Sequence, residues 1–211
     1  MKKTHLIILL IILSVFTAFG QAFEGKIVYS NSYKSKNQQM PDQQWQTMLG
    51  STQEYFIKDG DYKSISNGSL MQWQLYVNKD NKLYNKMSNS EMAVWNDCNN
   101  QGDEVLKTEV NKGVTEILGY KCDEVVLFCK SGAQRYYFNS KLSVDPKLFI
   151  NHKFGNWYQY LLLSKALPLK TVIETAQFTM TSVATEVKVE KLDGKQFQLP
   201  AGIQTQKAHI D

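Results

Sequence analysis

The segment that decides the predicted fold is residues 145–173, which read DPKLFINHKFGNWYQYLLLSKALPLKTVI. Asp145-Pro146 is typical of a helix start, because the aspartate caps free backbone N–H groups and proline fits the first helical position. Apolar side chains then recur at helical spacing on one face. That face consists of Phe154, Trp157, Tyr158, Leu161, Leu162 and the stem of Lys165. Pro168 ends the predicted helix, and residues 169–173 are strand-like again. Such an aromatic face needs an apolar partner, which we expect to be a sheet.

Most of the remaining chain consists of short alternating runs separated by turn signals, as in antiparallel strands. In residues 71–77, Met71, Trp73, Leu75 and Val77 share one face. Asp59-Gly60 is a strong hairpin-turn signal. Residues 41–49, closed by Gly50, have the spacing of a second short helix.

Roughly ten or eleven short strands with one main helical insertion exclude a parallel α/β fold, which needs helices between its strands. Two architectures remain, a sandwich and a curved antiparallel sheet with helices on its inner face. In a sandwich the two sheets bury each other, so the aromatic helix face has no apolar surface to pack against. We therefore predict an α+β, mostly β fold. Its strongly curved antiparallel sheet would form an incomplete β-barrel of about ten strands, with one or two helices packed on the concave face.

Residues 1–20 have the pattern of a secretory signal peptide. Lys2 and Lys3 precede a mainly apolar run from Leu6 to Phe19, which is too short for a stable membrane span. Cleavage before Gln21 would leave one domain, residues 21–211, and no later stretch is long enough to span a membrane. We expect a soluble periplasmic protein, with secretion or a peripheral envelope location as alternatives.

The charge pattern argues against nucleic acid as a partner. Without Lys2 and Lys3, 22 basic residues face 20 acidic ones, and the lysines alternate with acids instead of clustering.

The three cysteines, Cys98, Cys122 and Cys129, would all enter an oxidising compartment. Cys122 and Cys129 lie in one predicted strand at an odd separation, too far apart for a disulfide. The remaining pairs are Cys98–Cys122, which we favour, and Cys98–Cys129, and three unpaired thiols are a further alternative.

Five short motifs suggest a family. They are FEGKIVY at Phe23–Tyr29, ILGYKC at Ile117–Cys122, ALPLK at Ala166–Lys170, FTMT at Phe178–Thr181 and FQLPAG at Phe197–Gly202. Their order resembles an uncharacterised family of exported bacterial proteins related to the lipoprotein carrier (LolA/LolB-like) fold. The resemblance implies an incomplete β-barrel closed by helices around an apolar cavity for acyl chains.

On that resemblance, two groups of residues would bind an apolar ligand. Phe154, Trp157, Tyr158, Leu161 and Leu162 would belong to a helical lid, and Trp73, Leu75 and Val77 to the cavity wall. Lipoprotein carriers have a functional arginine on a strand, and Arg135 is the only arginine in this chain. No flanking motif equates Arg135 with theirs.

The sequence contains none of the common catalytic or nucleotide-binding motifs that we sought. His152 has no nucleophile or orienting acid placed beside it by sequence, and residues 97–108 lack the ligands of a calcium loop. We therefore expect no enzyme activity, no metal and no cofactor. The favoured hypothesis is an exported protein that binds a lipid or a lipoprotein acyl chain. The alternative is a structural or interaction module, with a side-chain-filled core, that binds an envelope protein.

Overall fold

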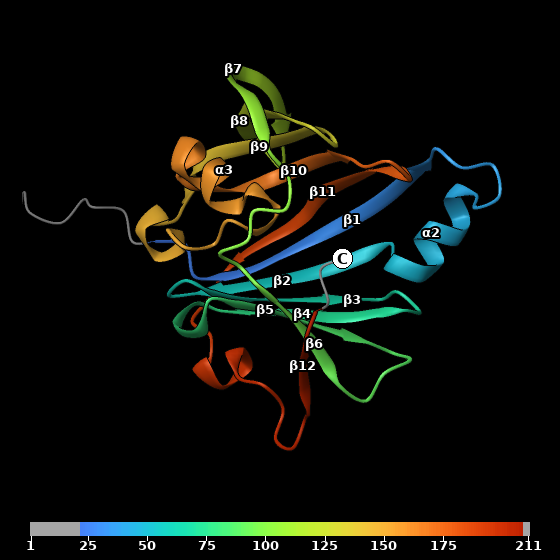
Figure 1. Cartoon of the computed structure of the whole chain (residues 1–211). Coiled ribbons are helices and arrows are strands. Elements are labelled where there is room, and N and C mark those ends of the chain that lie inside the picture. Colours follow the sequence, from blue (N-terminus) through green and yellow to red (C-terminus); the bar gives the residue numbers. More distant parts are fainter. Residues whose placement is uncertain (1–21, 209–211) are drawn as a thin grey trace, which may run out of the picture.

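The computed structural model describes residues 22–208, so the predicted signal peptide lies outside the described residues. Strands dominate the described part (Figure 1). No helix within residues 22–208 is long and apolar enough to cross a membrane. The elements in chain order are β1 Gly25–Ser35, α2 Asp42–Leu49, β2 Thr52–Lys58, β3 Asp61–Ser66, β4 Met71–Val77, η1 Asn78–Asp80, β5 Lys82–Met87, β6 Ala93–Asp97, β7 Val105–Ile117, β8 Tyr120–Cys129, β9 Gly132–Ser143, η2 Pro146–Phe149, η3 Phe154–Asn156, α3 Trp157–Ser164, β10 Ala166–Glu174, β11 Phe178–Val189, η4 Gly194–Phe197 and β12 Thr205–Lys207.

The strands form one sheet in the order β12-β6-β5-β4-β3-β2-β1-β11-β10-β9-β8-β7. Strands β1 to β6 are one meander and β7 to β11 are another, and β1 pairs with β11 to join them. The pairs are antiparallel except for β12 beside β6. The end strands β7 and β12 do not pair with each other, so the sheet is not closed into a barrel.

The prediction of about ten strands was wrong, because the sheet has 12. The tail after η4 returns to the sheet as β12, where Thr205, Gln206 and Lys207 lie beside Ala93, Val94 and Trp95. Three polar residues carry no alternating apolar pattern, so no strand was predicted there. The Asp59-Gly60 hairpin was predicted correctly. Both residues have positive φ, 49° and 90°, as a two-residue type I′ turn requires.

Both faces of the sheet are covered around β4. A larger core includes Tyr76 together with Tyr160 and Leu161 of α3, whereas a smaller core contains Leu75 with Phe197 of η4. Neighbouring residues in a strand point to opposite faces, so the two cores lie on opposite sides of β4.

Two α-helices lie in the described residues, and both correspond to predicted helices. Helix α3 packs against β8, β9 and β10 (Figure 1). It is shorter than expected, because Gly155 and Asn156 take left-handed conformations with φ of 63° and 61° and break the helical path before Trp157. Its buried face also differs from the prediction. Leu162 is 46% exposed, and Tyr160, which the periodicity left out, is fully buried.

The predicted Cys98–Cys122 disulfide was wrong: Cys98, Cys122 and Cys129 are free and buried. Cys98 follows β6 and Cys122 lies in β8, and eight strands separate β6 from β8 in the sheet. The loop after β6 carries Cys98 to η3 instead, where its carbonyl accepts hydrogen bonds from the backbone N–H groups of Lys153 and Phe154, at 2.7 and 3.2 Å. The number of residues between the cysteines does not indicate where the loop after β6 leads.

Replacing Leu161 with alanine should destabilise the fold, because a fully buried leucine truncated in this way costs about 2–5 kcal/mol. Leu162→Ala is the matched control on the next residue, and its exposed side chain predicts a change within about 0.5 kcal/mol. Urea denaturation of both variants measures the difference. A larger loss for Leu162→Ala would contradict the helix orientation described above.

The three cysteines should titrate as free thiols. Burial raises the pKa of Cys98 to about 12 and that of Cys129 to about 11, so the folded protein should react slowly with thiol reagents. Denatured protein should release all three thiols without reductant, and a reducing agent should leave the unfolding midpoint unchanged. A loss of about 2–5 kcal/mol on reduction would instead indicate a disulfide.

Candidate functional site

Hydrogen bonds and ring stacking fix the carboxyl-terminal end of α3. The Tyr160 hydroxyl and the Ser164 hydroxyl both donate to the carbonyl of Ala166, at 2.8 and 3.0 Å. The Tyr160 ring stacks on Tyr136 of β9, with centroids 4.2 Å apart. These contacts hold the helix against the β8–β10 part of the sheet.

Asn156 fixes the other end of α3. It is buried, and its side-chain amide donates to the Gln134 side-chain oxygen at 3.4 Å and to Cys129 Sγ at 3.3 Å. Its side-chain oxygen accepts from Gln101 Nε2 at 3.0 Å. Asparagine tolerates the left-handed conformation here better than most residues, so one side chain both turns the chain and anchors the helix.

Below the start of α3 lies a group of rings that we call the Tyr62 cluster: Tyr55, Tyr62, Tyr76, His152 and Trp157. Tyr62 is central, with its ring centroid 5.3 Å from Tyr55, 5.1 Å from Tyr76, 5.8 Å from His152 and 6.2 Å from Trp157. The Tyr62 hydroxyl lies 2.8 Å from His152 Nε2.

The Tyr62 cluster contains all the buried side-chain N and O atoms without a hydrogen-bond partner in residues 22–208. They are the Tyr55 hydroxyl, His152 Nδ1 and Trp157 Nε1. Most buried polar atoms in folded proteins are paired, so three unpaired atoms in one cluster need a physical explanation. Burial lowers the pKa of His152 from 6.5 to about 3, against a smaller opposing effect of its own backbone, so this imidazole is neutral at neutral pH.

A cavity of about 150 Å³ lies between Trp157 and the middle of the sheet. Its lining residues come from β1, β2, β10, β11 and the first residue of α3: Tyr29, Gln53, Tyr55, Trp157, Pro168, Thr171, Met180 and Ser182. Gln53, Thr171 and Met180 are half-buried, so this side of the cavity reaches solvent. The cavity therefore lies across the β1–β11 junction, with Trp157 as its helical wall.

Three polar side chains in this cavity wall already have hydrogen-bond partners. The Tyr29 hydroxyl donates to the Pro168 carbonyl at 2.7 Å, and the Ser182 hydroxyl donates to the Asn31 side-chain oxygen at 2.6 Å. Gln53 Nε2 donates to the Ser64 hydroxyl at 2.6 Å. By contrast, the Tyr55 hydroxyl and Trp157 Nε1 belong to wall residues and are unpaired.

The predicted lid residues only partly surround this cavity. Trp157 lines it, whereas Phe154 and Tyr158 pack against the larger core and Leu161 is buried within that core. Leu162 faces outward.

The predicted wall residues Trp73, Leu75 and Val77 lie in or against the smaller core, on the opposite face of β4 from α3. The alternation of this strand was read correctly, but its two faces were exchanged. The structure therefore does not bring the predicted wall and the predicted lid together.

Arg135 also lies away from the cavity. Its neighbour Tyr136 faces α3, so Arg135 projects from the opposite side of β9, where Nη1 lies 3.6 Å from Glu124 Oε1. Burial alone would raise the pKa of Glu124, but hydrogen bonds from Asn111, Tyr137 and Arg135, with the charge of Arg135, hold that pKa below its usual range. Arg135 is thus part of an ion pair on that face.

Sequence reasoning missed seven of the eight cavity residues. Tyr29 lies with Phe23 and Ile27 in the larger core. The alternation gave no indication that the cavity would form there, because its wall combines strands from both meanders.

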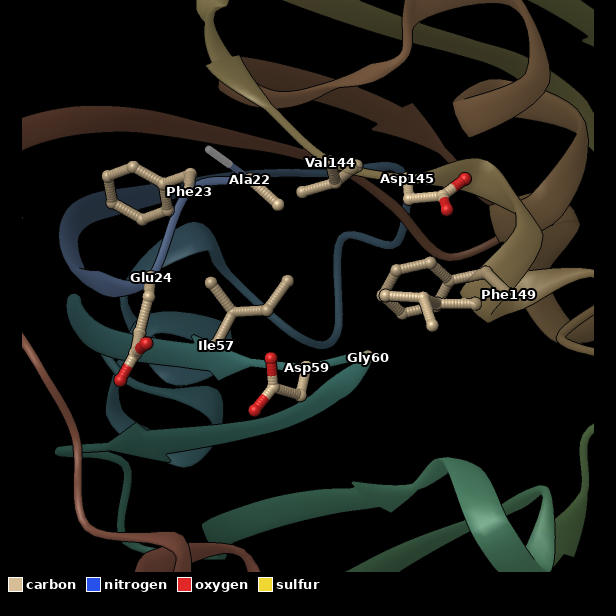
Figure 2. Close-up of a pocket in the computed structure, with 10 residues that line it drawn as sticks. Ala22, Phe23, Glu24, Ile57, Asp59, Gly60, Val144, Asp145 and Phe149 are labelled. Atoms are coloured by element: carbon tan, nitrogen blue, oxygen red, sulfur yellow. The ribbon is translucent and has the colours of Figure 1, made fainter. Parts of the chain in front are cut away.

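A second cavity, of about 100 Å³, lies where the described chain begins (Figure 2). Ile57, Val144 and Phe149 provide apolar walls, and Glu24, Asp59 and Asp145 lie around it. Glu24 pairs with Lys58 Nζ at 2.9 Å, and Asp145 accepts from the Lys147 backbone N–H at 2.9 Å. No three His, Cys, Asp or Glu side chains of residues 22–208 gather closely enough to hold a metal ion.

His152 should make the protein less stable in acid. Because its folded pKa of about 3 lies below the unfolded value of 6.5, only the unfolded chain binds its proton between these values. The free energy of unfolding should therefore fall as pH drops from 6.5 towards 3, by up to about 1.4 kcal/mol per pH unit from this residue. The pH slope of His152→Gln, measured by urea denaturation, should be flatter in this window. Parallel slopes for the two proteins would contradict the burial effect.

Comparisons with known proteins assign no family. No model of a known protein family matches the chain, and no curated protein matches it. The chain is similar to the structure of PNGF-II, with a TM-score of 0.48 and 16% identity, over 89% of this chain and 32% of that one. It is also similar to the crystal structure of LprF from Mycobacterium bovis, with a TM-score of 0.31 and 11% identity, over 80% of this chain and 89% of that one. Both TM-scores are below 0.5, so we base no functional argument on either similarity.

Proposed function

We propose that this chain is an exported, periplasmic binding protein that holds an apolar ligand between α3 and the centre of its sheet. The observation that carries this proposal is the cavity beneath Trp157, a mainly apolar hollow that opens to solvent beside Gln53, Thr171 and Met180, since ligand sites are typically concave and mainly apolar with a few polar groups. The missing catalytic motifs favour binding over catalysis. The order of motifs resembling the lipoprotein carrier fold suggests a lipid or acyl chain as the ligand class.

The cavity volume limits what can enter. An apolar cavity of about 150 Å³ accommodates a group about as large as benzene, and sites for larger ligands measure about 300–1,000 Å³. The end of an acyl chain or another small apolar group therefore fits beneath Trp157. The rest of a longer ligand has to extend into solvent through the side bordered by Gln53, Thr171 and Met180, or the ligand has to displace α3.

The alternative function, an interaction module without a ligand, rests on a different part of the molecule. Strand β7 ends the sheet and has no partner on its outer side in the described residues. Leu106, Val110 and Val114 along it are exposed, and so is Leu118 in the turn that follows. A free strand edge with apolar side chains can add a strand from another chain. On this alternative, an envelope protein binds β7 and the cavity plays no part.

Native mass spectrometry of the mature protein, purified from its own envelope without detergent, tests the proposal. We expect a one-to-one adduct of lipid mass, and we expect Trp157→Ala to lower the affinity for the recovered ligand because it removes the helical wall. Trp73→Ala is the matched control, since Trp73 lies on the opposite face of the sheet and its loss should leave the affinity unchanged. A bare polypeptide mass that added lipids do not change would contradict ligand binding. It would favour the β7 interaction module.

A further inference from the structure

Strand β7 presents a free edge to another chain. Within residues 22–208 it pairs with β8 on one side and ends the sheet on the other (Figure 1). In an antiparallel edge strand, every second residue directs its backbone N–H and C=O groups away from the neighbouring strand. Leu106 and Val110 of β7 are also 61% and 44% exposed. Backbone groups and apolar side chains of this edge are therefore both available to a further strand.

Two irregularities limit the length of this edge. The register of β7 against β8 shifts between Val105 and Lys107, and again between Asn111 and Thr115. Between the two shifts, the segment KTEVN at 107–111 pairs one to one with residues of β8. A β-bulge bends a strand and disrupts its ladder. A strand from another chain can therefore pair regularly with residues 107–111 only.

The charges in this segment are complementary to the same segment running in the opposite direction. Lys107 and Glu109 flank Thr108 and share one face of the strand, where Lys107 Nζ lies 2.7 Å from Glu109 Oε1. An antiparallel second copy, with its own Thr108 opposite Thr108, places each Lys107 opposite the Glu109 of the other copy. The next positions outward place Leu106 beside Val110. Opposite charges and apolar side chains across strands both stabilise pairing.

Other registers of two identical strands fit less well. Residues that are opposite each other in antiparallel strands point to the same face, so a two-fold axis must pass through a residue and not between two residues. An axis at Lys107 or Glu109 places two like charges opposite each other, which is destabilising. An axis at Val110 or Asn111 extends the pairing into the irregular part and leaves Lys107 without an opposite charge.

We propose that two copies of this chain form a dimer in which residues 107–111 of β7 pair antiparallel about a two-fold axis at Thr108. Two identical surfaces related in this way occupy each other, so the assembly stops at two copies. One short strand from each copy makes a small interface, so we expect a weak dimer that forms at micromolar to millimolar concentration.

This inference goes beyond the proposed function. Strands β8 and β9 separate β7 from β10, the nearest strand that lines the cavity. Dimerisation and ligand binding therefore use different parts of the sheet, and each can be measured without the other.

Sedimentation equilibrium of the mature protein tests the dimer. We expect a monomer–dimer equilibrium that shifts toward monomer as salt is added, because the ion pairs lie at an exposed edge. Glu109→Lys places lysine opposite lysine at both ends of the pairing, and Lys107→Glu places glutamate opposite glutamate. Each variant should weaken the dimer by roughly tenfold or more. Glu116→Lys is the matched control, since this exposed residue of β7 lies beyond the second register shift and should leave the dimer unchanged.

Two rescue measurements show whether the charges pair between copies. The double variant, with Lys107→Glu and Glu109→Lys in one chain, restores opposite charges across the axis and should dimerise like the original chain. A one-to-one mixture of the two single variants should form a mixed dimer at concentrations where each alone is monomeric, because each copy supplies the charges that the other needs. Thermal melting of every variant confirms that it is folded.

The remaining outcomes would overturn the inference. A monomer at every concentration would leave β7 to the envelope protein of the alternative function. A dimer that neither charge reversal weakens, or that Glu116→Lys weakens equally, would mean that the copies meet elsewhere. Failure of both rescues would exclude the axis at Thr108. None of these results bears on the lipid adduct that tests the proposed function, so the two can fail separately.

Discussion

Backbone pairing between β1 and β11 joins two meanders whose other antiparallel strand pairs link neighbours in sequence. The register runs from Gly25 opposite Val189 to Ser35 opposite Phe178. The first strand of the described chain therefore pairs with a strand near the end of that chain. Without this pairing, the two meanders would be separate sheets, each with a long exposed edge. The larger core and the cavity would each lose part of their walls, because both combine residues from the two meanders.

Buried polar contacts strengthen this junction next to the cavity. The Ser182 hydroxyl of β11 donates to the Asn31 side chain of β1, and the Tyr29 hydroxyl of β1 reaches the Pro168 carbonyl of β10. The β1–β11 register also shifts between Val28 and Tyr29, where one residue of β11 has no direct partner. A β-bulge bends a strand and redirects its side chains, and this one lies beside a cavity residue. The junction is therefore irregular where the proposed ligand would bind.

The Tyr62 cluster combines favourable apolar burial with unfavourable unpaired polar atoms. Aromatic rings provide the apolar surface that α3 needs, and the buried Tyr62–His152 contact pairs two polar groups. The same cluster leaves three polar atoms unpaired, an arrangement that is unfavourable for an isolated fold. Two of these atoms belong to residues of the cavity wall, Tyr55 and Trp157, and the third is Nδ1 of His152.

Local patterns predicted a substantial part of the fold. The alternation in residues 71–77 predicted β4, Asp59-Gly60 predicted the β2–β3 turn, and the apolar spacing after Phe154 predicted a helix in the segment that contains α3. The same helical spacing misassigned the buried face, choosing Leu162 over Tyr160, because the turn at Gly155 and Asn156 shifts the start of the helix. Of the proposed binding residues, only Trp157 was identified from sequence.

The sequence by itself determined where most of the strands, turns and helices form, since these depend on the periodicity of neighbouring residues. Only the tertiary structure decided which face of each strand meets α3, which strands lie side by side and where the three cysteines lie. Alternation along β4 distinguishes two faces but does not say which one a distant helix covers, and both are buried here. Trp73, Leu75 and Val77 therefore lie opposite the cavity, and Cys98 stays unpaired. The physical reason is that both outcomes depend on the long-range pairing of β1 with β11, which no local pattern encodes.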